Sequence, residues 1–186
     1  MKNIIRLSAL ILISAIGAVA QTPPSAVKFD SETISGLGAR NIGSAAMSGR
    51  IAALDAVQEG SRITIYVGAA SGGVWKSTNG GTTFKPVFDK QKVQSIGAVT
   101  IDPKNPKTVW VGTGEAWTRN SVSVGDGVYK SVDGGENWTY LGLNESERIV
   151  KILVNPKDTN NVYVCVTGKL WSDSDERGVY LSLIHI

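Results

Sequence analysis

A unit of about fifty residues repeats along this chain, and the repeat restricts the possible folds more than any other feature. Residues 73–81 and residues 127–135 both read Gly-Val-aromatic-Lys-Ser and both end in Gly-Gly, and the second copy starts 54 positions after the first. A third start, Gly178-Val179-Tyr180, follows 51 positions later. Repeats of this length indicate a fold that stacks one supersecondary unit several times.

A second element repeats upstream of the first. Residues 99–106 resemble residues 152–158, and each is followed by a β-rich run, residues 108–112 and 162–168. Residues 51–55 and 63–68 are the same element in the first copy. Each copy therefore predicts four short strands, and no helical periodicity of useful length occurs after the first twenty residues. Four-stranded units repeating every fifty residues or so are typical of β-propeller blades.

We therefore expect an all-β chain of four-stranded antiparallel blades, an incomplete propeller of about two and a half to three blades. The expected boundaries are a lead-in segment at 21–47, blades at 48–96 and 97–147, and a partial blade at 148–180. Propellers typically close with four to eight blades, so we interpret the chain as an N-terminal fragment.

Residues 181–186 break the repeat in mid-strand, and we expect them to be a non-native tail. One back-translation of this tail reads as a transposase adapter used in DNA sequencing libraries. The alternative is a short natural protein that assembles its blades between subunits.

The N-terminus predicts a signal peptide over residues 1–20. Lys2 and Arg6 flank a short apolar run, and Ala18-Val19-Ala20 forms a small-residue cleavage site. We therefore expect a secreted or periplasmic protein without stable membrane insertion after cleavage. Loss of the two cations lowers the formal charge of +3 to about +1 and leaves no basic cluster, so a nucleic-acid partner is not expected.

The inventory of reactive side chains is short. Cys165 is the single cysteine, which excludes an internal disulfide, and its apolar neighbours predict a buried small hydrophobe. The single histidine, His185, lies in the suspect tail. No histidine-based metal site or Ser–His–Asp triad is therefore expected, and we predict no metal and no cofactor.

The turn between the last two strands of each unit carries a recurring motif. Its second copy is Ser131-x-Asp133-x-Gly135-x-x-Trp138, and its first copy is Ser77-x-Asn79-x-Gly81-x-x-Phe84. A carboxylate or amide in a tight turn accepts backbone N–H bonds, while glycine adopts the positive φ that such turns need. We therefore predict a structural rather than a catalytic role for Asp133.

These motif residues resemble the Asp-box, or BNR-type, repeat. Over residues 36–180 the chain is similar to sortilin N-terminal-domain-like and bacterial "glycosyl hydrolase" propeller proteins. The resemblance implies a propeller scaffold that binds a protein or a glycan. Ligand sites in such folds lie on the face opposite the Asp-box turns, where the second strand of a blade connects to the third and the fourth connects to the next blade.

Two of these connections are long and rich in functional side chains. We expect the aromatic rings of Trp117 and Trp171 to stack on a ligand, unless they pack between loops. Arg119 is a candidate for binding a carboxylate. Arg50 is a further candidate ligand residue, and its alternative is a structural ion pair.

Three carboxylates are weak catalytic candidates, Glu115, Asp173 and Asp175. A glycoside hydrolase needs two carboxylates about 5 Å or about 6.5–9.5 Å apart, so Glu115 with either aspartate is the pair we nominate. The alternative is a solvated acidic turn at Asp173 and Asp175. The functions that remain open are a binding scaffold, a glycoside hydrolase, and a structural module of a larger secreted protein.

Overall fold

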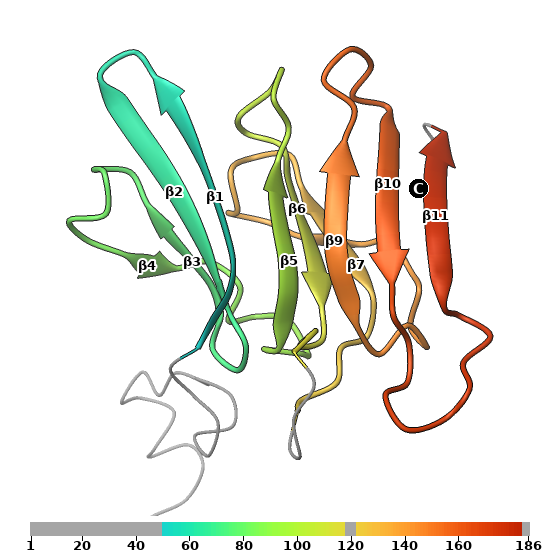
Figure 1. Ribbon diagram of the computed structural model, residues 1–186. Helices are drawn as coiled ribbons and strands as arrows, with labels where there is room; N and C mark the ends of the chain where they lie inside the picture. Colours follow the sequence, from blue (N-terminus) through green and yellow to red (C-terminus); the bar gives the residue numbers. More distant parts are fainter. Residues whose placement is uncertain (1–49, 118–121, 184–186) are drawn as a thin grey trace, which may run out of the picture. The chain divides into compact units, whose positions relative to one another are not determined.

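The computed structural model describes residues 50–117 and 122–183, which form eleven β-strands in three antiparallel sheets (Figure 1). The first sheet has the order β1 (Ile51–Glu59), β2 (Arg62–Ala69), β3 (Gly73–Ser77) and β4 (Lys85–Pro86). The second has the order β5 (Ile96–Ile101), β6 (Val109–Thr113), β7 (Val128–Ser131) and β8 (Thr139–Tyr140). The third has β10 (Asn161–Val166) between β9 (Ile149–Val154) and β11 (Gly178–Leu183).

These sheets confirm the predicted all-β fold of propeller blades, and we call them blades 1, 2 and 3. Neighbouring strands pair in chain order, as in a meander. Within the described residues no helix is long and apolar enough to span a membrane. The predicted signal peptide and lead-in segment lie outside the described residues. Leu181 and Ser182 of the predicted non-native tail pair with β10.

Strand register shows that the three blades are equivalent position by position. Ile51, Ile96 and Ile149 open the first strand of each blade, and their partners on the second strand are Ala69, Thr113 and Val166. Each pairing lies next to a register shift, so the local irregularity is repeated with the sequence.

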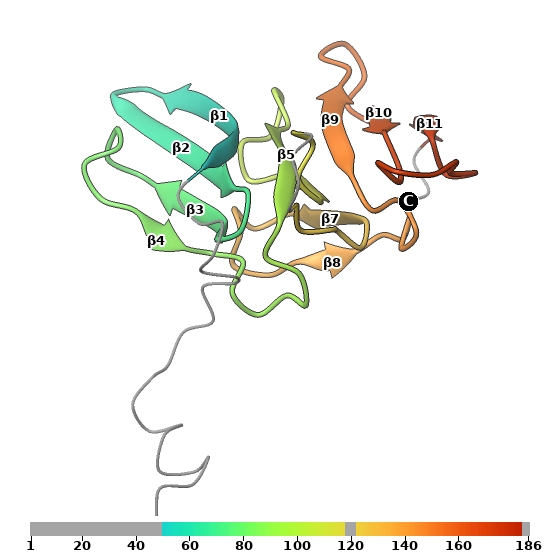
Figure 2. The same ribbon diagram turned by 60° about the horizontal axis from the view of Figure 1, so that its bottom comes forward.

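The blades pack face to face, with β5 lying between β1 and β9 (Figures 1 and 2). One apolar core joins blades 1 and 2, and a second joins blades 2 and 3. Glycine makes the close approach possible, because a Cβ atom at Gly68 would overlap the Ile96 side chain, and one at Gly112 would overlap Ile149. The first strand of each following blade therefore fits against a glycine of the second strand in the blade before it.

The turns after β3 and β7 have the same hydrogen bonds, as the repeated motif predicts. Ser131 Oγ donates to Asp133 Oδ1 (2.8 Å) and accepts from the Gly135 N–H (2.8 Å). The Asp133 carboxylate also accepts from the backbone N–H of Asn137 (2.9 Å) and from its side-chain amide (2.8 Å). These bonds, the backbone one first, lower the pKa of Asp133 to about 2.

In blade 1 the corresponding bonds join Ser77 Oγ to Asn79 Oδ1 and to the Gly81 N–H, both at 2.9 Å. Asn79 Oδ1 also accepts from the Thr83 N–H (3.0 Å). Both Gly81 and Gly135 have positive φ, which side-chain-bearing residues rarely adopt.

Trp138, the aromatic residue that ends the motif in blade 2, bonds to and packs against blade 1. Trp138 Nε1 donates to the Val87 carbonyl of blade 1 (2.7 Å), and its ring meets Phe88 edge-on at 5.1 Å. Tyr66 and Lys76 of blade 1 both donate to the Gly134 carbonyl in the same turn. Phe84, the equivalent of Trp138 in blade 1, is exposed.

Cys165 differs from its prediction, because it is half-buried rather than buried. It lies on β10 at the position that glycine occupies in β2 and β6. That face of blade 3 carries no further sheet among the described residues, so the thiol keeps partial exposure.

Candidate functional site

The connections predicted to carry function lie together at one end of the blades. Because neighbouring strands are antiparallel, the β2–β3, β6–β7 and β10–β11 loops share an end with the β4–β5 and β8–β9 connections. This end, which we call the loop face, is at the bottom of Figure 1 and is turned forward in Figure 2. The turns that contain Asn79 and Asp133 lie at the opposite end.

Arg50 and Glu115 form an ion pair on the loop face, between blades 1 and 2. Arg50 directly precedes β1, and Glu115 follows β6 by two residues. The Glu115 carboxylate is fully buried, whereas Arg50 is partly exposed. Arginine is permanently charged, so Glu115 is placed as the partner of a cation rather than as a free acid. Its second oxygen, Oε2, is buried without a hydrogen-bond partner.

The base of the long β6–β7 loop is held by buried polar groups. Thr113 Oγ1 accepts from the N–H groups of Asp126 (2.8 Å) and Gly127 (2.9 Å). The hydroxyl of Tyr129 donates to Asp126 Oδ2 (2.7 Å), and Tyr140 donates to the Asp126 carbonyl (2.9 Å). Burial and then the Asp126 bond raise the pKa of Tyr129, so this hydroxyl remains a neutral donor. The two described ends of the loop are therefore held together by hydrogen bonds.

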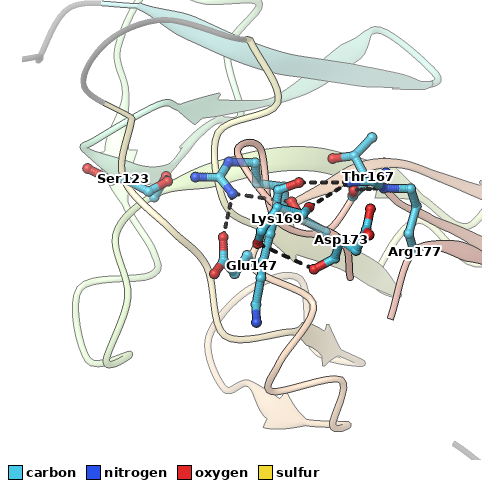
Figure 3. A network of polar contacts seen from close by, with 10 residues as sticks. Ser123, Glu147, Thr167, Lys169, Asp173 and Arg177 are labelled. Carbon is cyan, nitrogen blue, oxygen red and sulfur yellow. Dashed lines mark hydrogen bonds and ion pairs between the residues drawn. The ribbon is translucent and has the colours of Figure 1, made fainter. Parts of the chain in front are cut away.

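A second polar network organises the loop face between blades 2 and 3 (Figure 3). Arg148 is almost fully buried, and its Nη1 donates to Glu147 Oε2 (2.6 Å) and to the Gly168 carbonyl (3.2 Å). Arg177 donates to the carbonyls of Thr167 (2.8 Å) and Lys169 (2.8 Å). The β10–β11 loop is thus folded around Arg177, and Arg148 joins it to the end of the β8–β9 connection.

Trp117 and Trp171 are the most exposed tryptophans of the described residues, at 68% and 75%. They follow the equivalent positions Thr113 and Val166 by four and five residues, so they occupy similar places in consecutive blades. Among the described residues neither ring is packed between loops, which is the alternative interpretation of both. Arg119 lies outside the described residues.

The nominated carboxylates are not joined by any contact among the described residues. Glu115 is buried against Arg50, whereas Asp173 and Asp175 are exposed on the β10–β11 loop. In the described part of the chain, no group of three histidine, cysteine or acidic side chains is arranged to hold a metal ion.

A cleft of about 680 Å³ opens beside the loop face. Its walls come from the β4–β5 connection, the end of the β6–β7 loop and the β8–β9 connection. Its lining offers an aromatic ring, cations and an amide, namely Tyr140, Lys90, Lys92 and Asn144.

Sequence analysis missed Arg148 as a site residue, although a signal for it exists. Arg50 and Arg148 each directly precede the repeated isoleucine that opens a blade, and Ser95 has this place in blade 2. All three side chains bond to a loop on the loop face. Ser95 Oγ donates to the Ser123 carbonyl (2.9 Å), Arg50 pairs with Glu115, and Arg148 donates to the Gly168 carbonyl. Alignment of the blades on that isoleucine would have identified the position.

Two solved structures of similar fold are GH74 enzymes. An ancestral GH74 enzyme aligns with a TM-score of 0.55 and 23% identity, covering 75% of this chain. The GH74 enzyme of Niastella koreensis aligns with a TM-score of 0.48 and 25% identity, covering 63% of this chain. This chain spans 18% of the length of each enzyme. No family model and no curated protein matches the chain. The chain therefore has a glycoside-hydrolase-like β-propeller fold.

Proposed function

We propose that this chain is part of an exported β-propeller that binds a glycan through its loop face. The observation that carries the proposal is the pair of exposed tryptophans at similar places in consecutive blades. An exposed indole ring gains no stabilisation from apolar burial, so exposed tryptophans often mark a binding surface. Flat aromatic rings also stack well on the apolar faces of sugars.

Hydrogen bonds of further described loop-face residues support a binding surface whose loops are held in place before the ligand arrives. Arg148 and Arg177 hold the loop that carries Trp171, and Thr113 holds the base of the loop that carries Trp117. Such preorganisation lowers the ordering cost of binding. Tyr140 and Asn144 in the adjacent cleft supply an aromatic face and an amide for a further sugar unit.

The size of the effect follows from the exposed area. A tryptophan buries about 150–250 Å² when covered, and a sugar on one face covers about a third of that, which contributes about 1.5–2 kcal/mol. Replacement of either ring by alanine is therefore expected to weaken binding about tenfold or more.

The test is a panel of soluble β- and α-linked polysaccharides in affinity electrophoresis with the purified chain. Trp117→Ala and Trp171→Ala should each weaken retention by the bound polysaccharide. Phe84→Ala, which removes an exposed aromatic ring at the opposite end of blade 1, is the matched control and should bind as the original chain does. Equal retention of all four proteins contradicts the proposal.

A glycoside hydrolase is the second candidate, because a solved structure of similar fold is an ancestral GH74 enzyme. It needs a carboxylate that Arg50 does not already neutralise. Turnover of a panel polysaccharide that Asp173→Asn or Asp175→Asn abolishes would favour hydrolysis over binding alone. Retention by a protein ligand and by no polysaccharide would favour the sortilin-like alternative, and the absence of any ligand would favour a structural module.

A further inference from the structure

The cleft beside the loop face carries a pair of lysines that the repeat does not require. Lys90 and Lys92 line this cleft from the β4–β5 connection, and both side chains are exposed. When blades 2 and 3 are aligned on the isoleucine that opens each blade, Leu143 and Glu145 take the same two places in the β8–β9 connection. Because that connection folds without the two cations, their charge is not needed to build a blade and is available to a ligand.

A buried amide holds the segment that carries the two lysines. Gln94 is almost fully buried, and its Nε2 donates to the carbonyls of Phe88 (3.2 Å) and Gln91 (3.0 Å). The backbone N–H of Gln91 also donates to the Phe88 carbonyl (3.1 Å). Among the described residues no carboxylate forms an ion pair with either lysine. The backbone of this segment is therefore held in place, while both ammonium groups keep their full charge.

The cleft also offers an aromatic ring that is held in one orientation. Tyr140 is 45% exposed, its hydroxyl donates to the Asp126 carbonyl (2.9 Å), and its ring lies 5.2 Å from that of Tyr129. Asp126 supplies the carboxylate of the lining, and its Oδ2 accepts from the buried Tyr129 hydroxyl (2.7 Å). The lining therefore sets two unpaired cations against one carboxylate that already has an interior partner, and its net charge is positive.

We propose that this cleft binds an acidic sugar unit, whose carboxylate or sulfate group contacts Lys90 and Lys92 and whose ring stacks on Tyr140. The inference rests on the proposed function and narrows the ligand from a glycan to an anionic glycan. The cleft volume of about 680 Å³ lies within the range of about 300–1,000 Å³ that is usual for small-molecule sites. Uronates and sulfated sugars combine an apolar ring face with a negative charge, so they match an aromatic ring beside two cations.

The expected preference for an acidic sugar is moderate, because both lysines are exposed. A contact between an exposed ammonium group and an anion contributes little and is screened by salt. At low ionic strength we expect an acidic oligosaccharide to bind about five- to tenfold more tightly than its neutral counterpart. At about 1 M salt the difference should largely disappear.

The test is isothermal titration calorimetry with pairs of oligosaccharides that differ only in charge. One pair is an oligogalacturonate with its carboxyl-reduced form, and the other is a sulfated galactan oligosaccharide with its desulfated form, so the two sources of charge are distinguished. Lys90→Gln with Lys92→Gln should remove the preference for the charged member of a pair. Lys107→Gln with Lys157→Gln removes the same charge from two turns at the opposite end of the blades, and this matched control should keep the preference.

Equal binding of the charged and neutral members in both pairs overturns the inference, and so does a preference that the variant at residues 90 and 92 retains. The proposed function is judged separately, because Trp117→Ala and Trp171→Ala should weaken binding of both members of a pair. Binding that depends on the tryptophans but not on charge contradicts the acidic sugar alone. Absence of binding to these pairs and to the polysaccharide panel contradicts both proposals. Urea unfolding midpoints verify that each variant is folded.

Discussion

Replacement of Asp133 measures what the repeated turn contributes to stability. Its carboxylate accepts hydrogen bonds from Ser131 Oγ and from two nitrogens of Asn137. Each such bond contributes a net of about 1 kcal/mol, so Asp133→Ala is expected to lower the free energy of unfolding by about 2–3 kcal/mol.

Asp133→Asn is the matched variant, because Asn79 already occupies this place in blade 1. An asparagine keeps the acceptor oxygen for Ser131 and for the backbone of Asn137. It loses the charge assistance and the exposed bond that Oδ2 accepts from the Asn137 side-chain amide. We therefore expect a cost of about 0.5–1 kcal/mol for Asp133→Asn at pH 7. Urea unfolding followed by tryptophan fluorescence gives both values, from the shift of the unfolding midpoint when the denaturant slope m is unchanged.

Acid adds a second signature to the same comparison. The pKa of Asp133 is lowered to about 2, chiefly by the Asn137 backbone N–H, and is therefore below its unfolded value of 3.8. A depressed folded pKa gives stability that is present above pH 4 and is lost as the pH falls through about 2. After allowance for solvent screening this part is about 1 kcal/mol, and it should be missing in Asp133→Asn. Equal costs for the alanine and asparagine variants, or a stability difference independent of pH, would refute the reasoning.

Three further predictions concern the contacts between blades, each measured by urea unfolding. Trp138→Phe keeps the aromatic packing but removes the indole bond to blade 1, so we expect a loss of about 1 kcal/mol, against about 3–5 kcal/mol for Trp138→Ala. Gly112→Ala should cost about 1–3 kcal/mol through overlap with blade 3, whereas Gly178→Ala, which meets no atom within 4 Å, should be nearly neutral. Glu115→Gln leaves Arg50 without its counterion and should lower the free energy of unfolding by about 2 kcal/mol. The double variant Arg50→Met with Glu115→Leu should recover part of that loss. An unchanged free energy of unfolding in Glu115→Gln would show that the ion pair contributes nothing.

Strand positions were predictable because the repeat and its turn residues are local signals. The β-rich run predicted at residues 108–112 is strand Val109–Thr113, and the repeated segment 127–135 begins with strand Val128–Ser131. Proline and glycine in the intervening segments mark where each strand ends. Side chains that bond within a turn, such as Asp133, were predictable for the same reason.

Contacts between blades were less accessible to sequence reasoning. Arg50 and Glu115 are 65 positions apart, and they meet only because two separate blades pack in one register. The exposure of Cys165 depends on which sheet covers β10, and an apolar run does not reveal that. Both features belong to the packing of sheets rather than to their formation.

The central claim is that a glycan binds on the loop face. A titration followed by ¹H–¹⁵N NMR tests it most directly, through the indole N–H signals of the five tryptophans. Single Trp→Phe variants assign the signals, and the titrant is the polysaccharide from the panel that the chain retains, as short oligosaccharides. The account predicts shifts of the Trp117 and Trp171 signals, with those of Trp110 and Trp138 unchanged inside the blade interfaces. Shifts at Trp138 with Trp117 and Trp171 unmoved would contradict it.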